Sequence, residues 1–372
     1  MPENKYIIIE RGDFGSLFEV LKKKGYTLTG PTVRSNAVVY DDLSSVDDLP
    51  IGWTDKQDGG YYRLVRDKHD LLFGYVVGPQ SWKKFIYPPR RLLYEAKKAG
   101  HRYNPLPMEE IQVTRRALIG VRPCELQALA INDKVLTQGP YADPYYQKQR
   151  ANLFIVAVNC VRPGGTCFCA SMGTGPKAES GYDLVLTEVF DSGKHYFLAE
   201  AGSNSGRGLL NDITGRPADE SEISQAEQAV AEAVNRMGRK VDTRDLKTVL
   251  ENNFDHPHWE EITKRCLTCG NCTSVCPTCF CVNVEDTTSL GGETAQRWRR
   301  WDSCYNVDFS YIHGGSIRAT ETSRHRQWVM HKMSYWHDQF GTSGCVGCGR
   351  CITWCPVGID ITEEVRKILG GE

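Results

Sequence analysis

Several features are missing from this sequence of 372 residues, and each absence excludes a class of function. No apolar run approaches the roughly 18 residues that a helix needs to cross a bilayer, so we expect no membrane-spanning segment. Residues 1–5 lead directly into a short apolar run without the pattern of a secretory leader, which predicts a cytoplasmic protein. Lys and Arg number 45 against 46 Asp and Glu, so no net charge attracts nucleic acid or an anionic membrane. We therefore expect protein partners.

Nucleotide-binding motifs are missing as well. No G-x-G-x-x-G follows an apolar strand, and no G-x-x-x-x-G-K-[ST] occurs, so the sequence predicts no dinucleotide or nucleotide site in this chain.

Cysteine, by contrast, is abundant, with 15 in the chain. A chain of this length buries its own core and does not need disulfides, so a thiol framework that binds metal is the better interpretation. The spacing C-x2-C-x2-C-x3-C-P is typical of [4Fe–4S] ligands. It occurs twice, at Cys266, Cys269, Cys272 and Cys276 and at Cys345, Cys348, Cys351 and Cys355.

The two motifs predict two cross-ligated cubes. Small Gly270 and Gly349 allow the backbone to bend and aim amides at the sulfurs. A structural zinc site is the alternative, but such sites pair two C-x2-C knuckles and have no use for a third cysteine two residues on. In two-cluster ferredoxins the fourth cysteine crosses to the other cube. We therefore assign one cluster to Cys266, Cys269, Cys272 and Cys355, and a second to Cys345, Cys348, Cys351 and Cys276.

The pattern along the chain predicts an α+β protein. Short apolar, β-branched runs alternate with polar or helical stretches up to about residue 198, which indicates an α/β domain. We place this domain at residues 1–220, a helical linker at 221–254 and a helical, ferredoxin-like two-cluster domain at 255–372.

Three local expectations accompany this division. Residues 201–220 should form a surface loop, and a helix should follow across 223–237, with a capping box at Ser224 and Glu227. The 68 residues between the two motifs predict a helical insertion rich in Arg, Lys and His. Those cations are either solvated surface, or they offset the negative charge of the clusters or dock an acidic partner.

Four further cysteines predict a third cluster in the N-terminal domain. Residues 117–121 and 153–158 are expected to be parallel strands joined by a helix over 125–135. The carboxyl ends of parallel strands meet at one edge of a sheet, where α/β folds bind ligands. We therefore expect a third iron–sulfur cluster, of the [4Fe–4S] type, at Cys124, Cys160, Cys167 and Cys169. The alternatives are ordinary buried residues, or redox-active thiols at the last two positions.

Three cysteines remain, namely Cys279, Cys281 and Cys304. They either pack around the cubes or are three ligands of an incomplete set, and the sequence favours the packing interpretation.

Several of these segments together resemble one known family. They are Gly120-Val-Arg-Pro-Cys124-Glu, Asn159-Cys160, Thr166-Cys-Phe-Cys-Ala-Ser-Met-Gly173, Cys276-Pro-Thr-Cys-Phe-Cys281, Arg300-Trp-Asp-Ser-Cys304 and the motif that begins at Cys345. The chain resembles the iron–sulfur β subunit of cytoplasmic NADP-linked [NiFe] hydrogenases, also called sulfhydrogenases, and the related first subunit of anaerobic sulfite reductase. The resemblance extends from about residue 110 to the end. Glu125 stands where the family commonly has Asp.

The resemblance implies a non-catalytic electron-transfer subunit that works under anaerobic conditions. Its implied partners are a γ-type subunit that binds FAD and NAD(P) and the hydrogenase small and large subunits. The alternative partner is the sirohaem-containing catalytic subunit of a sulfite reductase. The motif that begins at Cys345 resembles the hydrogenase branch of the family more than the sulfite reductase branch. Two other classes stay open: an enzyme that reduces a small substrate at an exposed N-terminal cluster, and a thiol-redox sensor.

Overall fold

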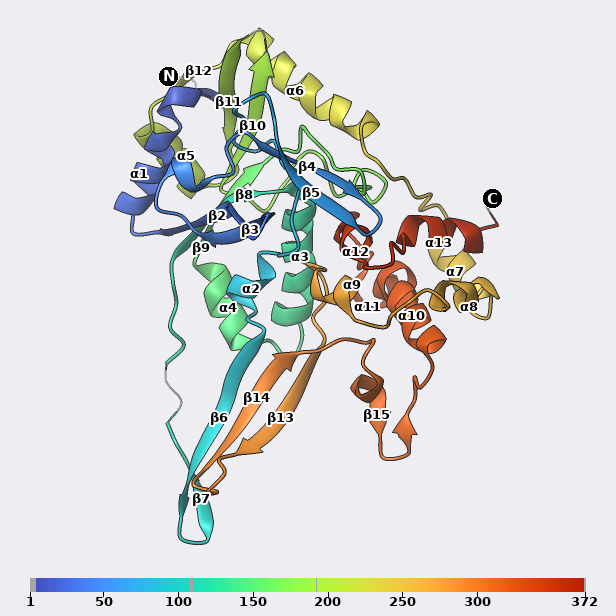
Figure 1. Cartoon of the computed structure of the whole chain (residues 1–372). Helices are drawn as coiled ribbons and strands as arrows, with labels where there is room; N and C mark the ends of the chain where they lie inside the picture. Colours follow the sequence, from blue (N-terminus) through green and yellow to red (C-terminus); the bar gives the residue numbers. More distant parts are fainter. Residues whose placement is uncertain (1–4, 108–109, 192, 371–372) are drawn as a thin grey trace.

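A mixed eight-stranded sheet forms the N-terminal part of the computed structural model, which describes residues 5–107, 110–191 and 193–370 (Figure 1). Four neighbouring strands in the middle, β2, β8, β9 and β10, are parallel, and the outer pairs are antiparallel. The parallel β8–β9 pair with its helical crossover confirms the predicted βαβ unit. Across the sheet the strands are β12 (Arg216–Pro217), β1 (Tyr6–Glu10), β11 (Lys194–Ala201), β10 (Leu184–Asp191), β9 (Leu153–Val158), β8 (Arg116–Val121), β2 (Thr27–Arg34) and β3 (Ala37–Asp42).

Helices cover both faces of this sheet. Because strand side chains alternate, Ile119 of β8 packs towards one face and Leu118 towards the other. The first face is covered by α1 (Gly15–Lys23) and α5 (Asn204–Asp212), and the second by α2 (Lys83–Ile86), α3 (Pro123–Thr137), α4 (Pro144–Ala151) and α6 (Glu220–Asn235).

A second sheet forms an arm that extends away from the rest of the molecule (Figure 1). It joins segments that are far apart in sequence, in the order β13 (Val282–Thr288), β14 (Thr294–Trp301), β6 (Arg90–Ala99) and β7 (Arg102–Pro105). The prediction of a helical insertion between the motifs was therefore wrong for β13 and β14. These strands are polar and half-exposed, and β14 is stabilised by pairing with the distant β6. The sequence around β13 and β14 gives no local sign of this pairing.

The C-terminal part is mainly helical and packs around its own apolar core. Buried Trp259, Trp328 and Val365 lie at its centre, and cysteines of both motifs pack against it. Its helices are α7 (Leu246–Asn252), α8 (His258–Thr263), α9 (Asn271–Ser274), α10 (Glu321–Met330), a π-helical turn (His331–Tyr335), α11 (Trp336–Phe340), α12 (Arg350–Thr353) and α13 (Ile361–Ile368). Two small hairpins complete the fold, β4 (Trp53–Asp58) with β5 (Tyr61–Arg66), and β15 (Tyr311–Ile312) with β16 (Gly315–Ser316).

Two local expectations need correction. Residues 201–220 are not an irregular loop, since they contain α5 and β12. The linker helix α6 begins earlier than predicted, because Asp219 is its N-cap and forms the capping box with Glu222. In the part of the chain that the structure describes, no helix has both the length and the apolar character required to cross a membrane.

Candidate metal centres

The first cysteine motif is folded into a tight loop that leads into α9. Thr268 and Gly270 both have positive φ, at 48° and 71°, and this turns the chain around the thiols. The Thr268 amide lies 3.4 Å from Cys266 Sγ, as expected for a loop that directs N–H groups at sulfur. Five cysteines line a single cavity with Tyr305 and Trp328: Cys266, Cys269, Cys272, Cys351 and Cys355. The four cysteines assigned to the first cluster are therefore brought together.

The second motif repeats the same backbone geometry. Gly347 and Gly349 have φ of 63° and 73°, and the Gly347 amide lies 3.5 Å from Cys345 Sγ. The thiol of Cys276 interacts electrostatically with those of Cys345, Cys348 and Cys351, so the cross-over cysteine from the first motif lies among the other three. Burial raises the pKa of Cys345 to about 12. Bound iron would supply the positive charge that stabilises the thiolate there.

The four N-terminal cysteines meet at the carboxyl edge of the parallel strands. Cys124 follows β8 at the start of α3, and Cys160 follows β9. Cys160 interacts electrostatically with Cys167 and Cys169, and Cys124 interacts with Cys169. Burial raises the pKa of Cys124 and of Cys167 well above the usual value. The donor set, four mostly buried thiols on a sheet edge, fits an iron–sulfur cluster.

The N-terminal group lies directly against the second motif. The Phe168 amide donates to the Gly347 carbonyl at 2.9 Å, and Thr174 Oγ1 donates to the Val346 carbonyl at 2.7 Å. Cys348 interacts electrostatically with Cys124 and Cys169. Since Cys351 also interacts with Cys272, the three groups of cysteines follow one another as neighbours.

A buried ion pair connects the same two elements. Arg350, inside the second motif, donates to Glu125 at 2.5 Å, and both side chains are 1% exposed. Glu125 also accepts from Tyr40 at 2.9 Å and from the indole of Trp82 at 3.0 Å, while Arg350 donates to the Gly78 carbonyl at 2.9 Å. The sequence marked Glu125 only as a departure from the family pattern. The structure gives it a structural role.

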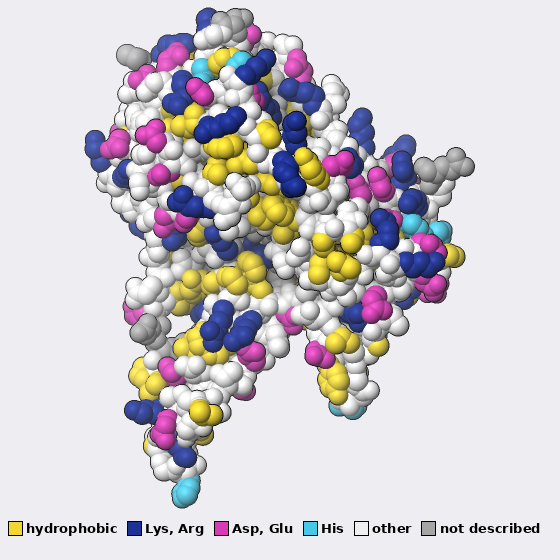
Figure 2. Space-filling view, in the orientation of Figure 1, with side chains coloured by type: hydrophobic (Ala, Val, Ile, Leu, Met, Phe, Trp, Pro, Cys, Tyr) yellow, Lys and Arg dark blue, Asp and Glu magenta, His cyan; other side chains and the backbone are white. Residues whose placement is uncertain are grey.

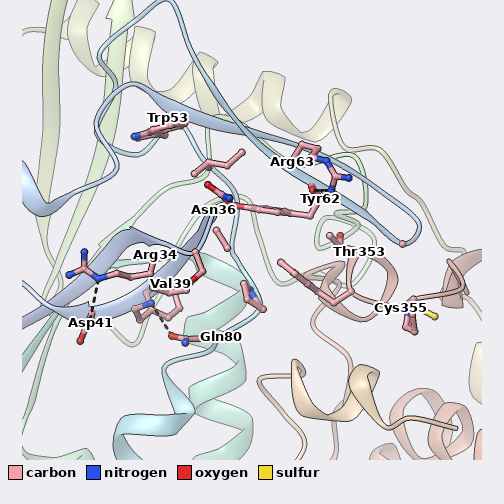
Figure 3. Close-up of a pocket in the computed structure, with 18 of the residues that line it drawn as sticks. Arg34, Asn36, Val39, Asp41, Trp53, Tyr62, Arg63, Gln80, Thr353 and Cys355 are labelled. Carbon is pink, nitrogen blue, oxygen red and sulfur yellow. Dashed lines mark hydrogen bonds and ion pairs between the residues drawn. The ribbon is translucent and has the colours of Figure 1, made fainter. Parts of the chain in front are cut away.

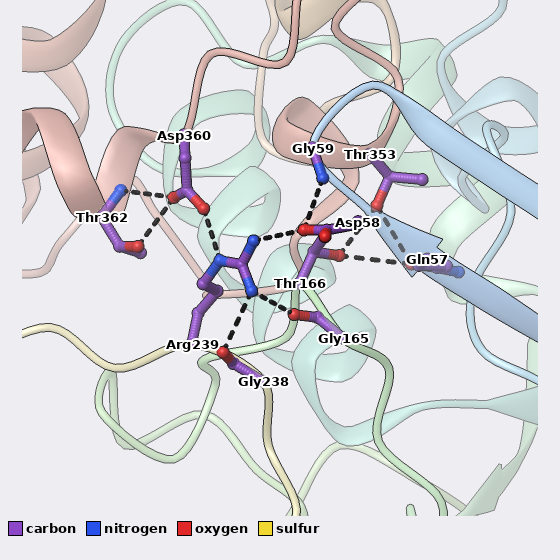
Figure 4. Close-up of polar contacts among 10 residues, drawn as sticks. All are labelled: Gln57, Asp58, Gly59, Gly165, Thr166, Gly238, Arg239, Thr353, Asp360 and Thr362. Atoms are coloured by element: carbon purple, nitrogen blue, oxygen red, sulfur yellow. Dashed lines mark hydrogen bonds and ion pairs between the residues drawn. The ribbon is translucent and has the colours of Figure 1, made fainter.

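A second polar network, around Arg239, holds the linker to both flanking regions (Figure 4). Its guanidinium donates to Asp58 at 2.5 Å, to Asp360 at 2.5 Å and to the Gly165 carbonyl at 2.9 Å. Gln57 accepts from both Thr166 and Thr353 in the same place, at 3.2 and 3.0 Å. The β4–β5 hairpin, the Cys167 loop and the second motif are therefore fixed relative to one another.

The basic residues of the insertion differ in their surroundings, between acidic partners and cysteine thiols. Arg297 pairs with Asp286, Arg299 with Asp143 and Arg300 with Glu285, so these cations have acidic partners on or near the arm. Lys332 is different, because it is 4% exposed and interacts with the Cys276 and Cys345 thiols. Lys83 of α2, which the sequence did not single out, is also buried beside Cys276 and donates to the Cys279 carbonyl at 2.5 Å.

An open cavity of about 1050 Å³ reaches the second motif from the surface (Figure 3). Trp354, Cys355 and Pro356 form one side, and the β3, β4 and β5 segments form the other. Its lining includes Arg34, Arg63 and Lys84. On this face, Figure 2 shows Lys and Arg side chains gathered around apolar ones.

No group of three or more His, Cys, Asp or Glu side chains among the described residues is placed to hold a single metal ion. Around one zinc ion, bonds of about 2.3 Å draw the thiolates closely together, whereas a cube spaces them more widely.

Comparison with known proteins agrees with this geometry. Residues 265–359, which include both cysteine motifs, match the family described as a 4Fe-4S dicluster domain. The chain is 29% identical to the sulfhydrogenase 2 subunit beta of Pyrococcus furiosus, over 98% of this chain and 99% of that protein. The chain is therefore similar to a sulfhydrogenase β subunit over nearly its whole length. The expected resemblance is therefore confirmed and includes the first hundred residues, whose motifs are less distinct. No solved structure matches this chain.

Proposed function

We propose that this chain is the electron-transfer subunit of a cytoplasmic [NiFe] hydrogenase complex. It relays electrons between a γ-type subunit that binds FAD and NAD(P) and the hydrogenase small and large subunits. The dicluster domain and the sulfhydrogenase relative support electron transfer in a hydrogenase, and the named partners follow from the family resemblance. The relative is a hydrogenase subunit, which favours this proposal over service to a sulfite reductase.

Three groups of cysteines would hold the clusters. The first is Cys266, Cys269, Cys272 and Cys355, the second Cys345, Cys348, Cys351 and Cys276, and the third Cys124, Cys160, Cys167 and Cys169. Clusters of this type supply one-electron transfer at potentials set by hydrogen bonds and burial. The chain itself directs amides at sulfur, buries the side chains of Cys124, Cys167 and Cys169 and fixes the spacing of the groups.

The observation that carries the proposal is the adjacency of the three groups. Cys272 and Cys351 link the first group to the second, and Cys348 and Cys169 link the second to the third. A protein that needed its clusters only for stability would have no reason to arrange them in a row from a surface cavity to a sheet edge. A relay needs this arrangement.

The test is the complex purified anaerobically with its natural partners. We expect a brown protein that contains nickel and lacks sirohaem, with EPR signals from reduced [4Fe–4S] clusters. The double variant Cys124→Ser/Cys160→Ser should lose about four irons per chain and retain the signals of the other cubes. A colourless preparation, or one with zinc in place of iron, would refute the relay, and an unchanged iron count in the double variant would refute the third site.

A further inference from the structure

The three cysteines outside these groups lie together at the base of the arm. Cys281 immediately precedes β13 and Cys304 follows β14, and the antiparallel pairing of these strands brings their ends together. The Cys304 backbone amide donates to the Cys281 thiol, and the Cys281 thiol interacts with that of Cys279. An amide directed at a sulfur is the same feature that both cluster motifs show.

Two lysines are buried beside these thiols. Lys83 and Lys332 are each 4% exposed. Lys83 Nζ donates to the carbonyls of Cys276 and Cys279 at 3.3 and 2.5 Å and lies 4.0 Å from the ring centre of Trp301. Lys332 belongs to the π-helical turn, an irregularity that occurs often at functional sites, and donates to Thr278 Oγ1 at 2.7 Å.

The charge of these lysines has no carboxylate partner among the residues that the structure describes. Lys83 donates to carbonyl oxygens, and Lys332 donates to Thr278 Oγ1, to the Gly344 carbonyl and to the Cys276 thiol. Two buried ammonium groups are unfavourable without nearby negative charge. Cys276 of the second group supplies one thiolate for both lysines, and the position of the lysines beside Cys279 and Cys281 indicates a further anionic group. The electrostatic partners of Lys83 are the thiols of Cys279, Cys276 and Cys281, and Lys332 interacts with all of these and with Cys304.

We propose that Cys279, Cys281 and Cys304 hold an additional iron–sulfur cluster, whose negative charge is balanced by Lys83 and Lys332. Thiolate-ligated clusters carry net negative charge, and the protein tunes their potential through nearby charges and hydrogen bonds. Cys304 also packs against the apolar core of the C-terminal part, but packing alone does not explain two buried cations beside the three thiols. The proposal extends the relay proposed above and rests on it for the assignment of Cys276 to the second group.

The fourth ligand position has a candidate in Asp302. Its charge acts on Cys281, and its amide donates to the Cys281 carbonyl at 2.9 Å. A carboxylate is a suitable ligand for iron when three thiolates supply the rest of the site. The additional cluster lies beside the first group as well, since Cys304 interacts with Cys272. It would therefore bring the relay to the base of the arm.

The proposal is tested by measuring the iron content of the full complex and subtracting the iron that belongs to the other subunits. We expect about sixteen irons in the wild-type chain rather than about twelve, and a loss of about four in the triple variant Cys279→Ser/Cys281→Ser/Cys304→Ser. EPR should show that the signals lost in this variant differ from those lost in Cys124→Ser/Cys160→Ser. An unchanged iron count in the triple variant would refute the additional cluster while leaving the relay intact.

A second variant covers the case in which the triple variant does not fold. Lys83→Met keeps every thiol and removes one buried cation, so the iron count should stay the same while the midpoint potential of one EPR signal falls. Lys84→Met is the matched control, because Lys84 donates to the Tyr40 carbonyl and contacts no cysteine thiol that the structure records. Unchanged midpoint potentials in Lys83→Met would refute the proposal. A wild-type iron count of about twelve per chain, all of it removed by substitutions in the three cysteine groups of the relay, would refute it as well.

Discussion

Glu125 and Arg350 illustrate how a single pair of residues secures the contact between two cysteine groups. Each lies next to a predicted cluster ligand, since Glu125 follows Cys124 and Arg350 precedes Cys351. At 1% exposure neither charge can be solvated by water, so each depends on the other and on the surrounding donors and acceptors. The pair therefore holds the second motif against the N-terminal sheet.

Glu125→Gln should destabilise the protein strongly. The amide keeps the shape but leaves the Arg350 charge buried without a counter-charge, and breaking such pairs costs about 3–5 kcal/mol. Chemical denaturation followed by circular dichroism measures the loss. Glu10→Gln is the control, since its pair with Arg216 is 48% exposed on both sides and contributes about 0–1 kcal/mol. Equal effects of the two substitutions would contradict the structural role given to Glu125.

Individual residues differ in how far the sequence could identify them. The eight motif cysteines follow from spacing alone, because cubane ligation requires a fixed short repeat. Lys83 could not be found in this way, since its neighbours Cys276 and Cys279 are almost two hundred positions away and its own segment has no motif. The ligand assignments themselves stay predictions.

At the scale of elements, the loop that carries the second motif fits against the Cys167 segment with no space to spare. A Cβ on Gly347 would lie 2.7 Å from the Cys169 backbone, and one on Gly349 would lie 2.4 Å from the Thr166 carbonyl oxygen. Neither contact can be relieved by turning a side chain, because the Cys169 and Thr166 atoms concerned belong to the backbone. Both glycines also have positive φ.

Gly347→Ala should separate the two elements and reduce the iron held by the N-terminal group. Gly341→Ala provides a matched control, because Gly341 has a φ of 68° and nothing within 4 Å of an added Cβ. The unfolding free energy of the control should fall only by the cost of the left-handed backbone conformation for alanine, about 1–2 kcal/mol. Iron content and unfolding free energy measured for both variants isolate the steric contact. The same loss in both would show that backbone conformation alone matters.

The elements that the sequence predicted are those whose signals are local. The βαβ unit was recognised because two buried strands flank one helix within a short stretch. The arm was missed because β14 pairs with β6, about two hundred residues earlier, through partly exposed strands with little apolar alternation. The division into three segments at 220 and 254 stays a prediction, and the arm sheet shows that segments from both ends of the chain form one structural element.

For the molecule as a whole, the path of electrons depends on where partners dock. The cavity beside Cys355 is a large open surface depression that reaches a group of cysteines and carries cations. Arg34 and Arg63 are exposed, and the ion pair of Arg34 with Asp41 is long, at 3.9 Å. A partner with acidic side chains around its own redox centre would be attracted to this face, and the attraction would be screened by salt.

Arg63→Glu should therefore slow electron exchange with the proposed flavin-bearing partner without removing any iron. We expect a fall of about tenfold in the second-order rate at low ionic strength, because electrostatic steering acts mainly on association, and a difference that shrinks as salt is added. Stopped-flow reduction of the clusters by the purified partner measures this rate. Arg207→Glu on α5 changes the net charge equally, but it lies outside the cavity and should have little effect. Equal slowing by both substitutions would indicate a response to net charge, and the docking face would then lie elsewhere.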